Sequence, residues 1–304
     1  MCGIAGFFDK GRNGQTCGVG RILLNMLNGL ACRGPDSAGV AIFASDGDDR
    51  TILRIKMGDG DHGSALGEKL TRFLETNYAG RFDFSAQCNS ARVAIAGAAG
   101  AHDIADTIEA LDDAIEVVSQ GQSLEIVKQV GSPAHLEEAY HVSTLTGTHG
   151  IGHTRLSTES KVDLSHSQPF GSHKLSDFAI VHNGHITNYH RLRRVYEQRH
   201  IRFYTENDSE VVAIYLADRM TNDSTLEQSL RSMQRDLDGS FSCLVATAGE
   251  FGFVKDPFAL KPLLWTETED FVALANEEVA IRFALPGDCE VREAQAGEVR
   301  VWQR

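Results

Sequence analysis

The chain has 304 residues, of which 42% are hydrophobic, and a formal net charge of −13. An acidic chain without a block of lysine and arginine is poorly suited to phosphate backbones, so we do not expect nucleic-acid binding. No apolar run approaches the ~18 residues of a membrane span. The N-terminus also lacks the basic and apolar regions of a signal peptide.

Six cysteines are scattered along the chain without Cys-x-x-Cys spacing. This pattern argues against a zinc site or a disulfide framework and favours a reducing compartment. We therefore expect an acidic, soluble, cytoplasmic protein that has no membrane partner.

The first elements are predicted from short periodic segments. Residues 4–8 are apolar and predict a buried strand, and apolar residues at helical spacing predict a helix over 19–30. Two more strands are expected at 40–44 and 51–56, and the turn residues 46–48 between them predict a hairpin. Short strands separated by turns favour antiparallel sheets.

The sequence pattern changes over the segment from about 58 to 147, which has few chemically distinctive residues. Helices are expected at 66–78 and 103–111, and strands at 115–118 and 124–127 are expected to form a hairpin. Both ends of the segment return to strand-like sequence. We interpret it as an α/β insertion that interrupts one domain.

The remaining chain alternates between strands and amphipathic helices. The expected strands are 150–154, 178–181, 240–248, 252–255, 263–265, 271–274, 290–292 and 298–302. The expected helices are 189–198, 208–220, 226–237 and a short one near 278.

Cys2 directly follows the initiator methionine. Methionine is usually removed before a small side chain, so Cys2 can become the first residue of the mature chain. Its free α-amine would titrate near pH ~8 and could activate its own thiol. The alternative is an incidental second-position cysteine, and these residues alone favour that alternative.

Five stretches in order give the chain a family resemblance. After Met-Cys-Gly-Ile come 33–39 (RGPDSAG), 152–158 (GHTRLST), 182–188 (HNGHITN) and 208–212 (DSEVV). In this order they resemble the class II glutamine amidotransferases, which are N-terminal-nucleophile hydrolases. The resemblance covers roughly residues 1–56 and 148–284. It implies an α+β, four-layer αββα fold with two stacked antiparallel sheets, and one glutamine amidotransferase domain over 1–304 with the insertion at about 58–147.

The resemblance also assigns the catalytic residues. Cys2 would attack the side-chain amide of glutamine, form a γ-glutamyl thioester and release ammonia. The Asn183 side-chain amide and the Gly184 N–H would form the oxyanion hole. The alternative for Asn183-Gly184 is a tight hairpin turn, for which Asn-Gly is the commonest sequence, and both interpretations can hold together.

The remaining site residues follow from the same resemblance. Arg155 would grip the substrate α-carboxylate, with a surface loop arginine as the alternative, and Asp208 would bind the α-ammonium, with a helix N-cap as the alternative. Thr158 and His182 are further candidates for substrate contacts. Around the nucleophile, the resemblance makes Arg33 the residue that orients Cys2 and Gly34 the one that leaves it room.

Two residues depart from the family pattern. Cys32 stands where His or Tyr usually precedes Arg-Gly, and Glu159 stands where many relatives begin a shorter, glycine-containing lid. We expect no metal and no cofactor, because the spacing of the histidines fits no zinc or iron pattern.

The resemblance implies a glutaminase subunit that hands ammonia to a separate synthase, because no acceptor domain is recognised in the chain. It is most similar to the stand-alone glutaminase subunits of glutamate-synthase-like systems, such as N-methylglutamate synthase. Two alternatives are a self-sufficient amidohydrolase of a γ-glutamyl compound and a catalytically silent regulatory module.

Overall fold

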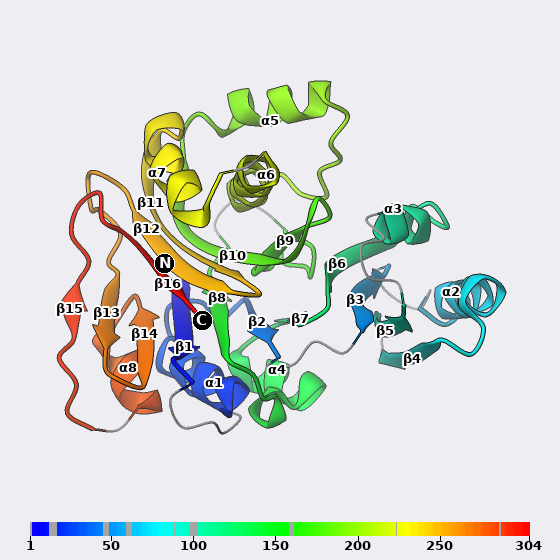
Figure 1. Cartoon of the computed structure of the whole chain (residues 1–304), viewed down its shortest axis with the longest axis horizontal. Helices are drawn as coiled ribbons and strands as arrows, with labels where there is room; N and C mark the ends of the chain where they lie inside the picture. The colour runs from blue at the N-terminus through cyan, green and yellow to red at the C-terminus, as the bar shows by residue number, and fades with distance from the viewer. Residues whose placement is uncertain are drawn as a thin grey trace.

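The computed structural model describes residues 2–11, 17–44, 49–58, 63–87, 89–97, 103–157, 161–222, 224–285 and 287–304. Within these residues the strands form three sheets, and every strand pair is antiparallel (Figure 1). Two of the sheets stack face to face, and the third forms a separate lobe at one side.

The largest sheet has seven strands and holds the N-terminal strand near its centre. Its order is β15 (Arg292–Glu293), β13 (Leu264–Glu267), β14 (Phe271–Ala275), β1 (Gly3–Asp9), β8 (His149–Arg155), β2 (Ser37–Phe43) and β7 (Leu124–Val130). Strands β2 and β8 are buried along their whole length. A strand covered on both faces is apolar without alternation, which is what the segment 40–44 displays.

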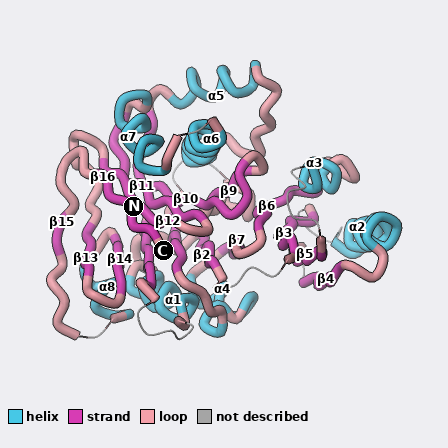
Figure 2. Tube along the Cα trace, in the orientation of Figure 1, coloured by secondary structure: helices cyan, strands magenta, loops and turns pink. Residues whose placement is uncertain are grey.

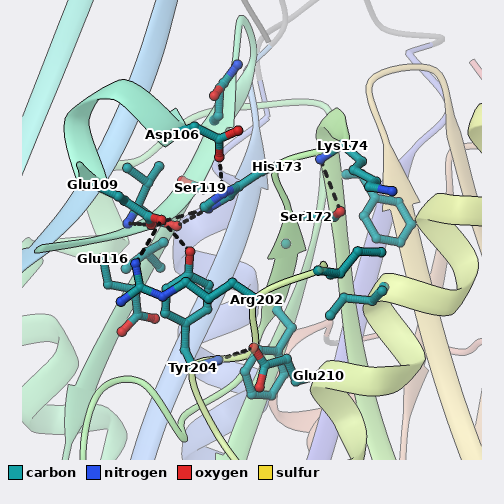
Figure 3. Close-up of a pocket in the computed structure, with 18 of the residues that line it drawn as sticks. Asp106, Glu109, Glu116, Ser119, Ser172, His173, Lys174, Arg202, Tyr204 and Glu210 are labelled. Carbon is teal, nitrogen blue, oxygen red and sulfur yellow. Dashed lines mark hydrogen bonds and ion pairs between the residues drawn. The ribbon is translucent and has the colours of Figure 1, made fainter. Parts of the chain in front are cut away.

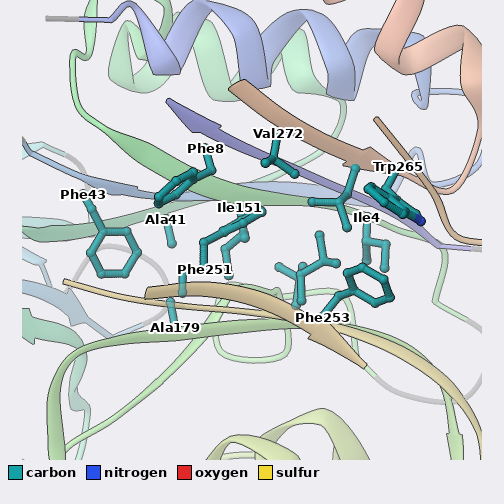
Figure 4. Close-up of a cluster of buried hydrophobic side chains, with 14 of the residues drawn as sticks. Ile4, Phe8, Ala41, Phe43, Ile151, Ala179, Phe251, Phe253, Trp265 and Val272 are labelled. Carbon is teal, nitrogen blue, oxygen red and sulfur yellow. The ribbon is translucent and has the colours of Figure 1, made fainter. Parts of the chain in front are cut away.

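The second sheet packs on the first. Its order is β16 (Val299–Gln303), β12 (Glu250–Lys255), β11 (Gly239–Thr247), β10 (Leu175–Ile186) and β9 (Phe170–Ser172). Between the two sheets, Phe8 and Ile151 of the first face Phe251 and Phe253 of the second in one apolar cluster (Figure 4). Burial of these large side chains holds the two sheets together.

Helices cover the outer faces of both sheets. On the seven-stranded sheet lie α1 (Val19–Gly29), α4 (Pro133–Tyr140) and α8 (Glu278–Ala284), with the short 3₁₀ helix η1 (Val142–Thr144). On the five-stranded sheet lie α5 (Tyr189–Gln198), α6 (Asp208–Thr221) and α7 (Leu226–Asp236). Figure 1 shows the resulting order of helices, sheet, sheet and helices. The predicted four-layer αββα fold is confirmed, and we call these four layers the sandwich.

The third sheet forms a small lobe with its own core. Its strands are β4 (Phe82–Gln87), β5 (Ser90–Ala96), β3 (Arg50–Met57) and β6 (Ile115–Gly121). Helices α2 (Gly63–Tyr78) and α3 (Asp103–Glu109) pack against it (Figure 2). Buried and partly exposed residues alternate along β3 and β5, as expected for a sheet covered on one face.

Both hairpins predicted in the first half of the chain are wrong. Strand β2 pairs with β7 and β8, whereas β3 pairs with β5 and β6, so 40–44 and 51–56 lie in different sheets. The predicted turn residues 46–48 lie outside the described residues. Long-range partners, which local sequence does not reveal, decided this pairing.

The second predicted hairpin, 115–118 with 124–127, is divided between the lobe and the sandwich. The short connection between β6 and β7 is held by Asp177, whose carboxylate accepts the backbone N–H groups of Gln122, Ser123 and Leu124 at 2.8–2.9 Å. These three hydrogen bonds give the backbone N–H groups of the connection their acceptors, while β6 and β7 belong to separate sheets.

No strand was predicted at β4, β5 or β9, and no helix at α4. Strands β4 and β5 lie in a stretch rich in alanine, serine and glycine, where apolar periodicity is weak. Helix α4 does carry a start signal, because Ser132 is its N-cap and Pro133 its first residue. Among the described residues, no helix is long and apolar enough to cross a membrane.

Candidate active site

Cys2 lies at one end of the sandwich, where β1 begins. Gly3 pairs with Thr154 of β8, so the chain enters the sheet directly after Cys2. The Cys2 carbonyl oxygen accepts the Arg33 Nε–H and the Asn183 Nδ2–H, each at 3.2 Å. The Cys2 thiol lies 3.7 Å from the Leu156 carbonyl oxygen. The start of the chain is therefore held by side chains from two separate parts of the sandwich.

Arg33 and Gly34 follow the C-terminal end of α1 and pass close to β8. The Arg33 guanidinium also forms an ion pair with Glu277, just before α8. A Cβ atom on Gly34 would lie 2.5 Å from the backbone carbon and oxygen of Thr154. This approach leaves no room for a side chain, so glycine is required for the loop to reach Cys2.

Asn183 and Gly184 lie inside strand β10, where they pair with Ser242 and Phe241 of β11. The alternative of a tight turn is therefore wrong, and the predicted end of the strand at 181 is too early. A Cβ atom on Gly184 would lie 2.2 Å from the Ser240 carbonyl oxygen. The sheet thus fixes both residues rigidly, and it directs the Asn183 amide to the start of β1.

Arg155 is the last residue of β8 and is only 4% exposed, so the alternative of a surface loop arginine is wrong. Its Nη1 donates to the Lys161 carbonyl oxygen at 2.8 Å. Burial lowers the pKa of Arg155, while the nearby Cys2, Asp163 and Asp36 act in the opposite direction. Thr158, the next candidate along the chain, lies outside the described residues.

Asp208 is the first residue of α6, and the N-cap is Asn207, whose side chain accepts the Ser209 N–H. The N-cap alternative for Asp208 is therefore wrong. One Asp208 oxygen accepts the Ile186 N–H at 2.9 Å, which fixes the carboxylate beside the end of β10. Its other oxygen lies 3.8 Å from Nδ1 of His182.

His182 is buried, and its ring and backbone are both held by hydrogen bonds. Its Nδ1 lies 2.8 Å from the Ser209 hydroxyl, and burial lowers its pKa, partly offset by Asp208. The Gln168 side chain accepts the His182 N–H at 2.7 Å and donates to the His182 carbonyl oxygen at 2.9 Å. The Gln168 side chain therefore holds β10 in place at His182.

No sequence pattern pointed to a role for Gln168, Ser209 or Glu277. Each completes a contact described above and lies 14 or more residues from its partner in the chain. Side-chain bonds over such separations have no local pattern in the sequence. They could be found only from the folded chain.

Comparison with known proteins identifies first the fold and then the family. A solved structure of the glutamine phosphoribosylpyrophosphate amidotransferase from B. subtilis, complexed with ADP and GMP, superposes with a TM-score of 0.63 at 19% identity. The match covers 99% of this chain and 47% of that chain, so this chain spans about half the length of that protein. This likeness defines the fold, which is that of the N-terminal-nucleophile hydrolases.

Sequence comparison defines the family. The family description "Glutamine amidotransferase domain" matches residues 153–283. A protein named "Putative glutamine amidotransferase" from Methanothermobacter thermautotrophicus is 34% identical over the full length of both chains. The "Glutamine amidotransferase-like protein GlxB" of Rhizobium meliloti is 37% identical over 92% of this chain and 91% of its own. The chain belongs to the glutamine amidotransferase family.

Proposed function

We propose that this chain is a glutaminase subunit that releases ammonia from glutamine and passes it to a separate synthase. In this proposal Met1 is removed and Cys2 is the nucleophile. The observation that carries the proposal is the 3.2 Å contact from the Asn183 amide to the Cys2 carbonyl, because it brings a donor from the second sheet to the nucleophile. An amide nitrogen has two hydrogens, so Asn183 keeps one donor for the substrate.

The reaction would proceed in two steps. The Cys2 α-amine takes the thiol proton, and the thiolate attacks the side-chain carbonyl carbon of glutamine. The negative oxygen of the tetrahedral intermediate accepts hydrogen bonds from the Asn183 side chain and the Gly184 N–H. The Cys2 α-ammonium then donates its proton to the nitrogen of the leaving amide, so ammonia departs and a γ-glutamyl thioester remains. A water activated by the same amine hydrolyses the thioester to glutamate.

Substrate binding is assigned to charged groups at the same end of the sandwich. The planar Arg155 guanidinium suits the glutamine α-carboxylate, and the fixed Asp208 carboxylate suits the α-ammonium. Arg33 and Gly34 orient the nucleophile. His182 supports Asp208 and β10, and Thr158 remains a candidate contact to the substrate.

The proposal extends to the whole chain and to its partner. We treat 1–304 as one glutamine amidotransferase domain interrupted by an insertion. Because β3 begins at Arg50 and β7 belongs to the sandwich, we place this insertion between β2 and β7 rather than over 58–147. The proposed partner is a glutamate-synthase-like subunit, with N-methylglutamate synthase as the nearest system.

An exposed apolar loop supports a docking surface near the site. Phe258 and Leu260 are each 70% exposed. The same loop ends at Pro262, whose carbonyl oxygen accepts the Asn276 amide, and Asn276 in turn accepts the Ile4 N–H beside Cys2. A synthase bound over Phe258 and Leu260 would cover the end of the sandwich where ammonia is released.

The test is intact mass together with glutamine hydrolysis by purified wild-type protein, Cys2→Ala and the control Cys32→Ala, which removes an exposed thiol. We expect loss of Met1 and a fall of at least about a thousandfold in rate for Cys2→Ala alone. Unchanged hydrolysis in Cys2→Ala would contradict the nucleophile assignment. Co-purification from cells tests the partner, and the absence of any synthase-like polypeptide would contradict the subunit role.

A further inference from the structure

A large cavity lies between the small lobe and the five-stranded sheet. Its volume is about 800 Å³, and its lining comes from α3 and β6 of the lobe and from β7, β9, β10 and α6 of the sandwich. Figure 3 shows the Tyr204 side chain next to Glu109 of α3, with Asp106 and Glu210 farther away. The lining includes neither Cys2 nor Asn183, so this cavity is separate from the proposed glutaminase site.

Lys128 of β7 lines this cavity and is only 5% exposed. Among the residues that the structure describes, its ammonium makes neither a hydrogen bond nor an ion pair, and it lies over the Phe170 ring, 4.8 Å from the ring centroid. Burial lowers the pKa of Lys128 to about 8, with Glu116 and Glu210 acting in the opposite direction. A buried cation without an acceptor is costly, and an anionic group in the cavity would relieve that cost.

Glu116 supplies an opposite charge in the same cavity. One of its oxygens accepts the Ser165 hydroxyl, and no ion pair within 4.0 Å joins Glu116 to Lys128. The neighbouring Glu109 carboxylate is already engaged, because it accepts the Val117 N–H at 2.7 Å together with the Tyr204 hydroxyl. Lys128 and Glu116 therefore carry opposite charges without forming an ion pair with each other, and both residues line the cavity.

The rest of the lining includes apolar walls. Val117, Phe178, Ile201 and Ile214 all face the cavity. Polar and charged groups beside apolar walls occur in sites for small organic ligands. A ligand that meets this lining carries one negative group, one positive group and an apolar body.

We propose that this cavity binds an amino acid with an apolar side chain. Its carboxylate accepts hydrogen bonds from the Lys128 ammonium, its own ammonium donates to Glu116, and its side chain packs on the apolar walls. This binding is independent of glutamine hydrolysis at Cys2.

A divalent cation is the competing occupant. Ligand atoms of Asp106, Glu109 and His173 lie within 4.8 Å of one another. However, both Glu109 oxygens already accept hydrogen bonds, and His173 Nε2 lies 3.0 Å from the Val117 carbonyl oxygen. A cation bound by all three residues would have to displace these contacts, which disfavours a metal at this cluster.

The test is isothermal titration of L-leucine into full-length Cys2→Ala protein at pH 7, without L-glutamine, which carries the same two charged groups and would compete for the cavity. We expect one saturable site. The matched compounds 4-methylpentanoate, which lacks the ammonium, and 3-methylbutylamine, which lacks the carboxylate, should each bind at least tenfold more weakly.

Two variants locate the site. Lys128→Met should weaken L-leucine binding at least tenfold, whereas Lys174→Met, at an exposed lysine on the same cavity, should change it less than twofold. If Lys128→Met does not fold, as judged by circular dichroism, Glu116→Gln serves in its place with the same expected loss.

Absence of saturable L-leucine binding, or equal binding in Lys128→Met, overturns the proposal. Saturable binding of Mn²⁺ that Asp106→Asn abolishes, without L-leucine binding, would assign the cavity to a cation instead. Because the titration uses Cys2→Ala protein and needs no turnover, its failure is distinct from a failure of the proposed glutaminase function.

Discussion

The sandwich and the small lobe use antiparallel sheets in opposite ways. In the sandwich, helices cover both outer faces, so strands such as β2 are buried from end to end. In the lobe, helices pack on one face only, and strands such as β4 remain largely exposed. A sheet enclosed on both faces fixes its side chains more firmly. The proposed Cys2 site lies at the end of the sandwich, while the lobe contributes one wall of the Lys128 cavity.

The two cores can be compared by removing one large side chain from each. Phe251→Ala, between the two stacked sheets, should lower the free energy of unfolding by roughly 3–5 kcal/mol, because it leaves a cavity in a closely packed core. Glutaminase activity should fall as well, since the sheets that hold Cys2 and Asn183 would lose their spacing. Urea unfolding and glutamine hydrolysis measure the two effects.

Leu70→Ala is the matched change in the lobe, where Leu70 is fully buried. It should lower stability by roughly 2–5 kcal/mol but leave glutamine hydrolysis within a few-fold of wild type. If Leu70→Ala reduces hydrolysis as much as Phe251→Ala does, the site depends on the lobe and the distinction between the two regions fails.

A buried histidine makes the sandwich sensitive to acid. His149 is fully buried, stacks on Phe43, and has its pKa lowered by burial from 6.5 to about 4. The unfolded chain therefore binds one more proton than the folded chain between these values. The stabilising effect of a neutral His149 is complete above pH 6.5 and is lost as the pH falls towards 4. Over this range the free energy of unfolding decreases by about 3 kcal/mol.

His149→Gln should remove this part of the pH dependence, because glutamine does not titrate. The exposed His190→Gln is the control. Urea unfolding measured from pH 7 to pH 4.5 gives the slope of the unfolding free energy against pH for each variant. An unchanged slope in His149→Gln would show that other groups cause the acid sensitivity.

The smallest expected effect concerns the junction between the two regions. Glu125 of β7 accepts hydrogen bonds from Arg54 and Arg92 of the lobe, at 2.9 and 2.8 Å. Burial raises the pKa of Glu125, but the Arg92 hydrogen bond and the Arg54 charge lower it more, so the net shift is downward. This junction therefore stabilises the protein above about pH 4.5 and weakens as the pH falls below that value.

Glu125→Gln should cost roughly 1–3 kcal/mol at pH 7, since it removes a partly buried charge that two arginines share. The matched control is Glu75→Gln, at an exposed position on α2. Hydrogen exchange would locate the loss at β3, β5 and β7. Equal stability of the two variants would mean that the ion pairs contribute nothing to joining the lobe to the sandwich.

Local sequence was sufficient for most elements of the sandwich. The apolar period of 19–30 predicted α1, and the continuous apolar run at 40–44 predicted a buried strand. The order of Cys2, Arg33-Gly34, Arg155, Asn183-Gly184 and Asp208 was enough to suggest the family, which the comparisons confirmed. These features depend on neighbouring residues or on residue order, both of which are present in the chain before it folds.

Strand partners and site contacts were decided by the tertiary structure. Strand β2 does not pair with β3, the next strand in the chain. It pairs with β7, which begins at Leu124. Asn183 reaches Cys2 across 181 positions of sequence because two sheets stack there. Pairing and stacking of this kind depend on which apolar faces the whole chain can bury together. No local period encodes that choice, which is why the predicted hairpins were wrong and the Lys128 cavity was not foreseen.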